Sequence, residues 1–173
     1  MAGGPTTHRF ADAGGIPNSP LPVLIYQGVE AAGTARGCQE LFARNGWLGA
    51  WVDGIYRFHH FHSTAHEVLG IVGGSAAVIL GGPEGQRFDV GPGDVLVLPG
   101  GTGHFNAGSS ADLVVVGAYP NGMRPDLRRG EAAERAEVLA NIVAVPLPES
   151  DPVHGQSGPL TELWRPDITA GRP

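Results

Sequence analysis

Short apolar runs separated by glycine and proline fill the middle of the chain. Eight such runs lie at residues 47–52, 55–62, 67–72, 76–80, 87–90, 94–98, 104–106 and 113–119. Many short strands joined by tight turns are typical of a β-barrel or jelly roll. We therefore predict an all-β fold whose barrel core covers about residues 47–119.

Two short helices are predicted beside the barrel. Residues 34–45 begin with Thr34 as a candidate N-cap, place apolar side chains on one face and end before Gly46, so we expect an amphipathic helix outside the barrel. Residues 131–141 form the second predicted helix, with one face made of Ala132, Ala136 and Leu139.

The ends of the chain have a different character. Residues 1–19 lack periodicity and predict a loose arm, and residues 20–26 predict a strand that two prolines confine to a sheet edge. Residues 120–173 form a C-terminal extension, whose tail from 146 is turn-rich and is expected to wrap the barrel or a partner subunit. A chain of 173 residues is too short for two comfortable domains, so we expect one domain over 20–173.

Charge and hydropathy narrow the range of partners. The net charge is -6 and the arginines do not cluster, so nucleic acid is not an expected partner. No apolar run approaches the roughly 20 residues that span a bilayer, and the N-terminus lacks an apolar signal core. We expect a cytoplasmic protein without a membrane partner.

Histidines concentrate in the segment 59–67. On a strand, His60 and His62 point to the same face about 6.5 Å apart, so both imidazoles can share a metal ion. Glu67 can join them only if a turn at residues 63–65 reverses the chain. The fourth candidate ligand, His104, follows a run rich in glycine and proline. Because Cys38 is the only cysteine, any metal must lie on histidine and carboxylate.

These residues resemble the two motifs of the cupin superfamily. Gly54, His60, His62, Glu67 and Gly74 have the spacing of the first motif. The second motif matches at Gly93, Pro99, Gly101 and His104, 18 residues further on. Gly108 stands where the family expects asparagine, and Asn106 lies two residues earlier. More loosely, the whole chain resembles small bacterial single-domain cupins without an assigned function.

The resemblance implies a cupin barrel that holds one divalent transition metal through His60, His62, Glu67 and His104. Fe(II) or Mn(II) is favoured, and the mixed nitrogen and oxygen ligands also suit Ni(II), Cu(II) or Zn(II). A metal-free barrel is the alternative. The resemblance also implies a homodimer.

Strand alternation predicts the lining of the site. Tyr56 and Phe58 share the face of His60 and His62, and Leu69 and Ile71 share the face of Glu67. With Asn106, these residues predict a narrow, mostly apolar pocket for a small organic substrate. Tyr56 is the candidate catalytic residue, as a general acid or a substrate contact, unless it is a packed core tyrosine.

Four protein ligands leave two positions of an octahedral ion for substrate or O2. The resemblance implies two enzyme classes, oxygenases and isomerases or lyases. We favour a metal-dependent oxygenase because the lining offers few acid–base groups beyond Tyr56, with an isomerase or lyase as the second hypothesis and a small-molecule sensor as the third. Of the remaining histidines, His59 and His66 are expected to be structural, and His8 and His154 to be solvated.

Overall fold

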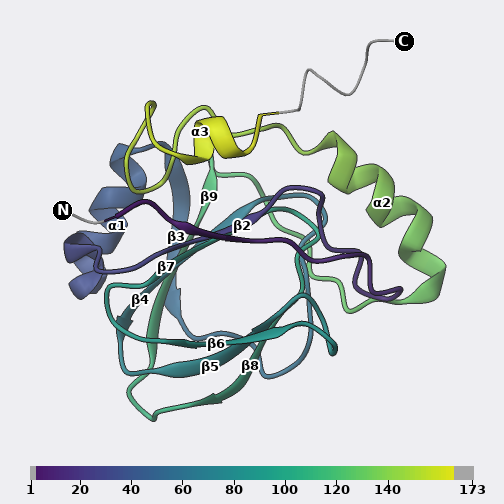
Figure 1. The fold of residues 1–173 in the computed structure, drawn as a ribbon, viewed down its shortest axis with the longest axis horizontal. Coiled ribbons are helices and arrows are strands. Elements are labelled where there is room, and N and C mark those ends of the chain that lie inside the picture. Colours follow the sequence, from purple (N-terminus) through teal and green to yellow (C-terminus); the bar gives the residue numbers. More distant parts are fainter. Residues whose placement is uncertain (1–2, 166–173) are drawn as a thin grey trace.

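The computed structural model describes residues 3–165, which fold into two facing antiparallel sheets (Figure 1). The larger sheet has the strand order β1-β2-β7-β4-β9-β3 and the smaller one the order β6-β5-β8. The strands are β1 (Thr6–His8), β2 (Val23–Tyr26), β3 (Trp47–Asp53), β4 (Glu67–Gly73), β5 (Ala76–Leu80), β6 (Gln86–Val90), β7 (Val95–Leu98), β8 (His104–Ser109) and β9 (Val114–Pro120). The predicted all-β barrel is confirmed.

Helical segments lie outside the barrel. They are η1 (Glu30–Gly33), α1 (Ala35–Arg44), η2 (Ala132–Glu134), α2 (Arg135–Ala144) and α3 (Leu160–Leu163). None of the helices within residues 3–165 has the length and apolar character needed to cross a membrane.

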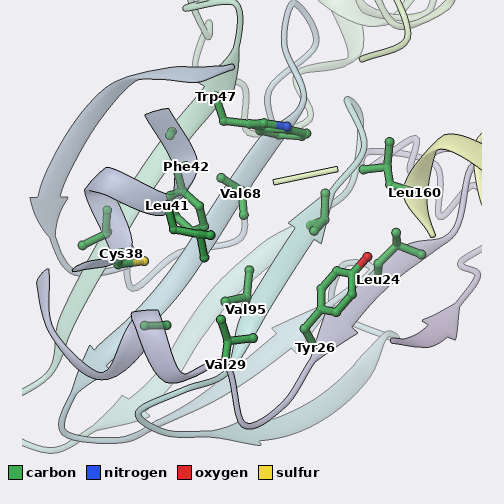
Figure 2. Close-up of a cluster of buried hydrophobic side chains, with 14 of the residues drawn as sticks. Leu24, Tyr26, Val29, Cys38, Leu41, Phe42, Trp47, Val68, Val95 and Leu160 are labelled. Carbon is green, nitrogen blue, oxygen red and sulfur yellow. The ribbon is translucent and has the colours of Figure 1, made fainter. Parts of the chain in front are cut away.

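Side chains on β4 alternate between two apolar clusters. Leu69 and Ile71 pack in the interior between the two sheets. Val68 points to the opposite face and joins Cys38 and Phe42 of α1 in a second cluster (Figure 2). This period of two is the pattern of a strand buried on both faces, and it orients Glu67 toward the interior with Leu69.

Helix α1 begins and ends as predicted. The Thr34 hydroxyl accepts a hydrogen bond from the Gly37 N–H at 3.0 Å, which satisfies one of the free donors at the helix N-terminus. Gly46, just beyond the helix, has a φ of +78°, a conformation that favours glycine. Cys38, Leu41 and Phe42 form its buried face.

The prediction for the N-terminal segment is wrong. Thr6–His8 forms β1 and pairs with β2, so β2 lies between β1 and β7 instead of at the sheet edge. Pro20 and Pro22 precede the first residue of β2 and therefore remove no hydrogen bond from its ladder. Asn18 is buried and donates to the carbonyl of Gly81 at 3.0 Å, which fixes the arm to the barrel.

The C-terminal extension packs on the barrel of its own chain. The predicted face of the second helix, made of Ala132, Ala136 and Leu139, is exposed, and Val138 is the buried residue of α2. Val138 packs against Ile16 and Phe61, two segments distant in sequence that helical periodicity alone does not reveal.

The tail is fixed by polar contacts. The buried Asp151 carboxylate accepts hydrogen bonds from the backbone N–H groups of Val153, His154 and Leu160. The Trp164 indole N–H donates to the carbonyl of Pro22 at 2.8 Å. The described part of the tail therefore wraps the barrel, while residues 166–173 lie outside the described residues and a contact with a partner subunit remains a prediction.

Candidate metal centre

The run at residues 55–62 does not form the predicted strand. The Asn106 N–H donates to the Tyr56 carbonyl at 3.0 Å, and His60 exchanges two backbone hydrogen bonds with His104. The four-residue step from Tyr56 to His60 therefore lies opposite the two-residue step from Asn106 to His104. The two extra residues form a bulge. Strict alternation fails between residues 56 and 60 for this reason.

Glu67 and His104 come from regular strands. Glu67 begins β4, after a bend at residues 63–64 in the predicted turn, and His104 begins β8 opposite Leu80. Glu67 Oε2 lies 3.0 Å from His62 Nε2, and Oε1 lies 3.6 Å from His104 Nε2. The structure therefore brings the predicted carboxylate to the histidines.

The three candidate imidazoles converge. One ring nitrogen from each of His60, His62 and His104 lies within 4.8 Å of the others. The ring centroids of His60 and His104 are 4.0 Å apart, and that of His62 is 5.3 Å from His104. Three imidazoles beside one carboxylate match the ligand types of a divalent transition-metal site.

Backbone carbonyls orient all three rings. His60 Nδ1 faces the Phe58 carbonyl at 2.9 Å, His62 Nδ1 the Asp126 carbonyl at 2.5 Å, and His104 Nδ1 the Thr102 carbonyl at 3.0 Å. A carbonyl only accepts, so each Nδ1 carries the proton and a neutral ring has its lone pair on Nε2. This is the arrangement in which histidine binds a metal through Nε2.

The electrostatics of this cluster suit a bound cation. Burial, reinforced by the neighbouring His104, lowers the pKa of His60 to about 3. Burial also opposes a charge on His62, yet the hydrogen bond and charge of Glu67 leave the pKa of His62 above its ordinary value. Burial opposes the charge of Glu67 as well, but His104 and His62 hold the pKa of its carboxyl well below its usual range.

Among the described residues, His104 Nε2 is buried without a hydrogen-bond partner. A buried nitrogen lone pair beside an ionised carboxylate is costly unless a cation or donor meets it. The three imidazoles therefore fit a divalent metal, which would replace the proton that His62 shares with Glu67, and ligation by Glu67 itself stays a prediction.

A cavity of about 450 Å³ adjoins the histidines. Its walls are mostly apolar and aromatic, and they are formed by Trp51, Val52, Asp53, Gly54, Ile55, Tyr56, His60, His62, Glu67, Leu69, His104, Tyr119, Pro125, Asp126 and Leu127. This volume lies in the range of small-molecule sites.

The predicted lining is only partly present. Tyr56 and Leu69 line the cavity. Phe58 does not line the cavity, because the bulge directs its side chain elsewhere. The Arg129 guanidinium lies over the Phe58 ring, 4.1 Å from the ring centroid. Ile71 does not line the cavity, because it is fully buried in the apolar core between the sheets. Asn106 is also outside the lining: its side chain donates to the Ser109 hydroxyl and accepts from the Gly108 N–H. Tyr56 is 55% exposed, so it is not a packed core tyrosine.

Two aromatic residues of the cavity were missed. Trp51 Nε1 donates to the Tyr119 hydroxyl at 2.7 Å, and burial together with the charge of Glu67 raises the pKa of Tyr119. Alternation along the predicted strand 113–119 could have identified Tyr119, because Val115 and Gly117 lie on the same inward face.

Two other histidines lie outside the cluster, as expected. His66 Nδ1 accepts from the Gly100 N–H at 2.9 Å while Nε2 faces the Pro146 carbonyl at 3.1 Å, and burial lowers the pKa of His66 to about 4. The His59 ring packs on Phe105 with a centroid distance of 4.4 Å.

Comparison with known proteins gives a consistent family match. A family model described as Cupin matches residues 54–141. The uncharacterized protein YjlB of Bacillus subtilis (strain 168) is 38% identical over 160 residues, which cover 91% of this chain and 95% of that protein.

Solved structures give weaker similarities. The acireductone dioxygenase from Bacillus anthracis with a cadmium ion in its active centre is 22% identical, with a TM-score of 0.38, over 53% of this chain and 63% of that one. A mutant of the Bacillus subtilis oxalate decarboxylase OxdC is 20% identical, with a TM-score of 0.38, over 66% of this chain and 29% of that one. This chain therefore spans less than two thirds of either protein.

Proposed function

The chain belongs to the cupin family, and from this membership and the geometry of its site we propose that it is a metal-dependent enzyme acting on a small, metal-chelating organic substrate. The observation that carries the proposal is the convergence of one ring nitrogen from each of three histidines beside the Glu67 carboxylate, at the edge of a cavity of about 450 Å³. Fe(II) or Mn(II) is the metal we favour, with Ni(II), Cu(II) or Zn(II) also compatible with these ligands.

The geometry supports oxygenase chemistry first. When bound, the metal would supply Lewis acidity and open coordination positions for substrate and O2. The protein holds the ligands by its backbone carbonyls, keeps Glu67 ionised and surrounds the substrate with apolar walls. Tyr56 and Tyr119 place hydroxyls in the cavity that can orient substrate oxygens.

An isomerase or lyase is the second candidate, and Tyr119 favours it. Our preference for an oxygenase rested partly on a lining with few acid–base groups beyond Tyr56. The buried hydroxyl of Tyr119, beside Glu67, provides another proton donor for a substrate whose carbonyl the metal polarises.

The test is elemental analysis of protein purified without added metal, combined with O2 consumption on a panel of acids, thiols and diketones. We expect about one metal per chain, O2 uptake with at least one compound, and neither in the His104→Ala variant. Turnover without O2 uptake would favour the isomerase or lyase, and binding without turnover the sensor. Failure to bind any divalent metal after reconstitution would overturn the proposal.

A further inference from the structure

His62 is held in place by a segment more than 60 residues away. Its Nδ1 faces the Asp126 backbone carbonyl at 2.5 Å, and His62 lies beyond the last bridge of its own irregular segment. No strand ladder orients this ligand, unlike Glu67 and His104 in β4 and β8.

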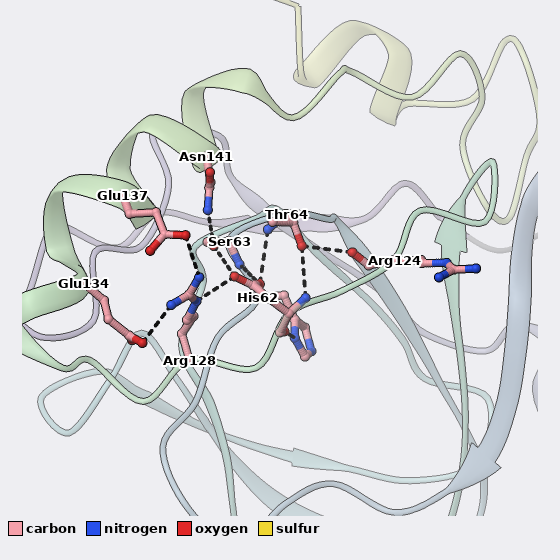
Figure 3. A network of polar contacts seen from close by, with 9 residues as sticks. His62, Ser63, Thr64, Arg124, Arg128, Glu134, Glu137 and Asn141 are labelled. Atoms are coloured by element: carbon pink, nitrogen blue, oxygen red, sulfur yellow. Dashed lines mark hydrogen bonds and ion pairs between the residues drawn. The ribbon is translucent and has the colours of Figure 1, made fainter.

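The side chain of Asp126 fixes the chain just after His62. Asp126 Oδ1 accepts from the N–H groups of Ser63 at 2.6 Å and Thr64 at 3.3 Å, and Oδ2 accepts from the Ser63 hydroxyl (Figure 3). In return, Thr64 Oγ1 accepts from the Asp126 N–H at 3.0 Å and donates to the Arg124 carbonyl at 2.9 Å. Each of the two segments, 62–64 and 124–126, therefore both donates hydrogen bonds to the other and accepts hydrogen bonds from it.

Helix α2 supports this connection from outside. Arg128 Nε bonds to Asp126 Oδ2 at 2.8 Å, and its other nitrogens reach Glu134 at 2.8 Å and Glu137 at 3.1 Å. Asn141 Nδ2 donates to the Ser63 hydroxyl at 3.1 Å. Figure 3 shows these side chains between α2 and the His62 segment.

We propose that Asp126 is a positioning residue of the metal centre, and that residues 124–141 are part of that centre instead of an appendage to the barrel. Its carbonyl holds the proton of His62 on Nδ1, and its carboxylate fixes the turn that carries His62 and leads to Glu67. The inference rests on the proposed metal site, because it concerns the orientation of one of its ligands.

The test compares Asp126→Ala with Asp53→Ala, titrated with Co(II) and examined by EPR after loading with Cu(II). Asp53 lines the same cavity, but its carboxylate bonds to the adjacent Gly54 N–H and not to the His62 segment. Loss of a residue that hydrogen-bonds to a metal ligand and orients it weakens metal binding about 10- to 100-fold. We expect such a loss, with an altered nitrogen hyperfine pattern, in Asp126→Ala only.

Asp126→Asn keeps an acceptor for the Ser63 N–H and should restore most of the affinity and the spectrum. A residue that only stabilised the fold would lower the melting temperature and leave the spectrum unchanged. Wild-type affinity and spectrum in folded Asp126→Ala would overturn the inference. If Asp126→Ala does not fold, a wild-type spectrum in Arg128→Met together with a twofold or smaller loss of metal affinity in Ser63→Ala would overturn it. Absence of metal from the wild type would instead contradict the proposed function.

A second observation concerns Trp51, in the wall of the same cavity. Trp51 of β3 pairs with Gly117 of β9, and a Cβ atom at position 117 would lie 2.1 Å from Cε2 and Cζ2 of the indole. The indole therefore lies directly on the glycine backbone. Its N–H donates to Tyr119, which fixes the ring while its face lines the cavity.

The structure assigns Trp51 as a specificity-determining residue that favours substrates with a flat apolar ring next to their oxygen donors. Trp51, Tyr56 and Leu69 supply the aromatic and apolar contacts, and the imidazoles and Tyr119 supply the polar ones. Aromatic rings contribute contact energy beyond the area that they bury. This assignment also depends on the proposed function.

Benzohydroxamate and acetohydroxamate test it, since the two probes share one chelating group and differ in the ring. With Co(II)-loaded protein, we expect wild type to bind benzohydroxamate about 10-fold more tightly, as burial of a ring predicts. Trp51→Ala, and Gly117→Ala by displacing the indole, should both remove the preference. Phe88→Leu, on β6 and outside the lining, should keep it. Equal binding of both probes by wild type, or an unchanged preference in folded Trp51→Ala, would overturn the assignment without affecting the metal site.

Discussion

At the scale of single residues, the protonation state of each histidine follows from the group that faces its Nδ1. Nδ1 of His60 and of His104 faces a backbone carbonyl, which leaves Nε2 of each ring for a metal, whereas His66 accepts at Nδ1 from a backbone N–H. The same side chain is therefore a candidate ligand in one place and a structural acceptor in another.

Replacing a ligand should be far more damaging than replacing its neighbour. We expect His60→Ala, His62→Ala and His104→Ala each to weaken metal binding by more than about 100-fold, because the loss exceeds that of an outer partner. His59→Ala should leave the metal content near that of wild type, since its ring packs on Phe105. Isothermal titration with Co(II) measures both, and loss of metal from folded His59→Ala would contradict the assignment.

His66 should make the metal-free protein less stable in mild acid. Its pKa is about 4 in the folded state against an ordinary value of 6.5, so the unfolded chain binds a proton first and stability falls as pH drops from about 6.5 toward 4. From pH 7 to pH 5 we expect a contribution of about 2 kcal/mol. Urea unfolding of the chelated protein at the two pH values measures it.

His66→Gln provides the control for the pH experiment. Glutamine can donate and accept like the neutral imidazole but does not titrate. The variant should lose about one proton from the pH dependence, while His60 continues to contribute because its pKa is also depressed. An unchanged slope would show that His66 is not responsible.

At the scale of elements, the position of α1 depends on a glycine in β4. A Cβ atom on Gly70 would lie 2.3 Å from Cys38 Sγ and 3.2 Å from Phe42 Cζ. The helix can approach the sheet only because β4 presents bare backbone there. Cys38 and Phe42 belong to the apolar cluster shown in Figure 2.

Gly70→Ala should therefore destabilise the protein through overpacking, by about 1–3 kcal/mol. The same substitution should cost less in a Cys38→Ala background, since removing the sulfur opens the space. A double-mutant cycle by urea unfolding should give a coupling of about 1 kcal/mol. Additive effects of the two substitutions would contradict this account of the contact.

At the scale of the whole molecule, we expect the barrel to fold without the metal. Two large apolar clusters, one between the sheets and one under α1, contain most of the buried side chains. The metal ligands occupy only one end of this core. Binding should therefore stabilise a structure that already exists, in contrast to small proteins that fold only around their metal.

Chelation should lower the melting temperature and leave the protein folded at room temperature. A ligand at 100 times its dissociation constant stabilises by about 2.7 kcal/mol. For a chain of this size, that corresponds to a shift of roughly 5–10 °C. Scanning calorimetry with and without chelator measures it, with His104→Ala as the control that should not respond. Identical melting curves after verified removal of metal would contradict the site.

The sequence by itself determined the fold class and the four candidate ligands. Strand periodicity and glycine punctuation are local properties, so seven of the eight predicted core runs are strands. The ligand spacing is also present along the chain: the three histidines that it selects converge, and Glu67 lies beside two of them. Leu69 and Tyr56 followed from the same pattern.

Only the tertiary structure decided the surroundings of these ligands. The bulge before His60, which excludes Phe58 from the cavity, arises from pairing with β8. Trp51 and Tyr119 meet because β3 and β9 are neighbours, and Asp126 reaches His62 across 63 residues of intervening chain. Alternation describes where a side chain points within one strand, whereas register, bulges and long-range hydrogen bonds depend on which segment lies beside it.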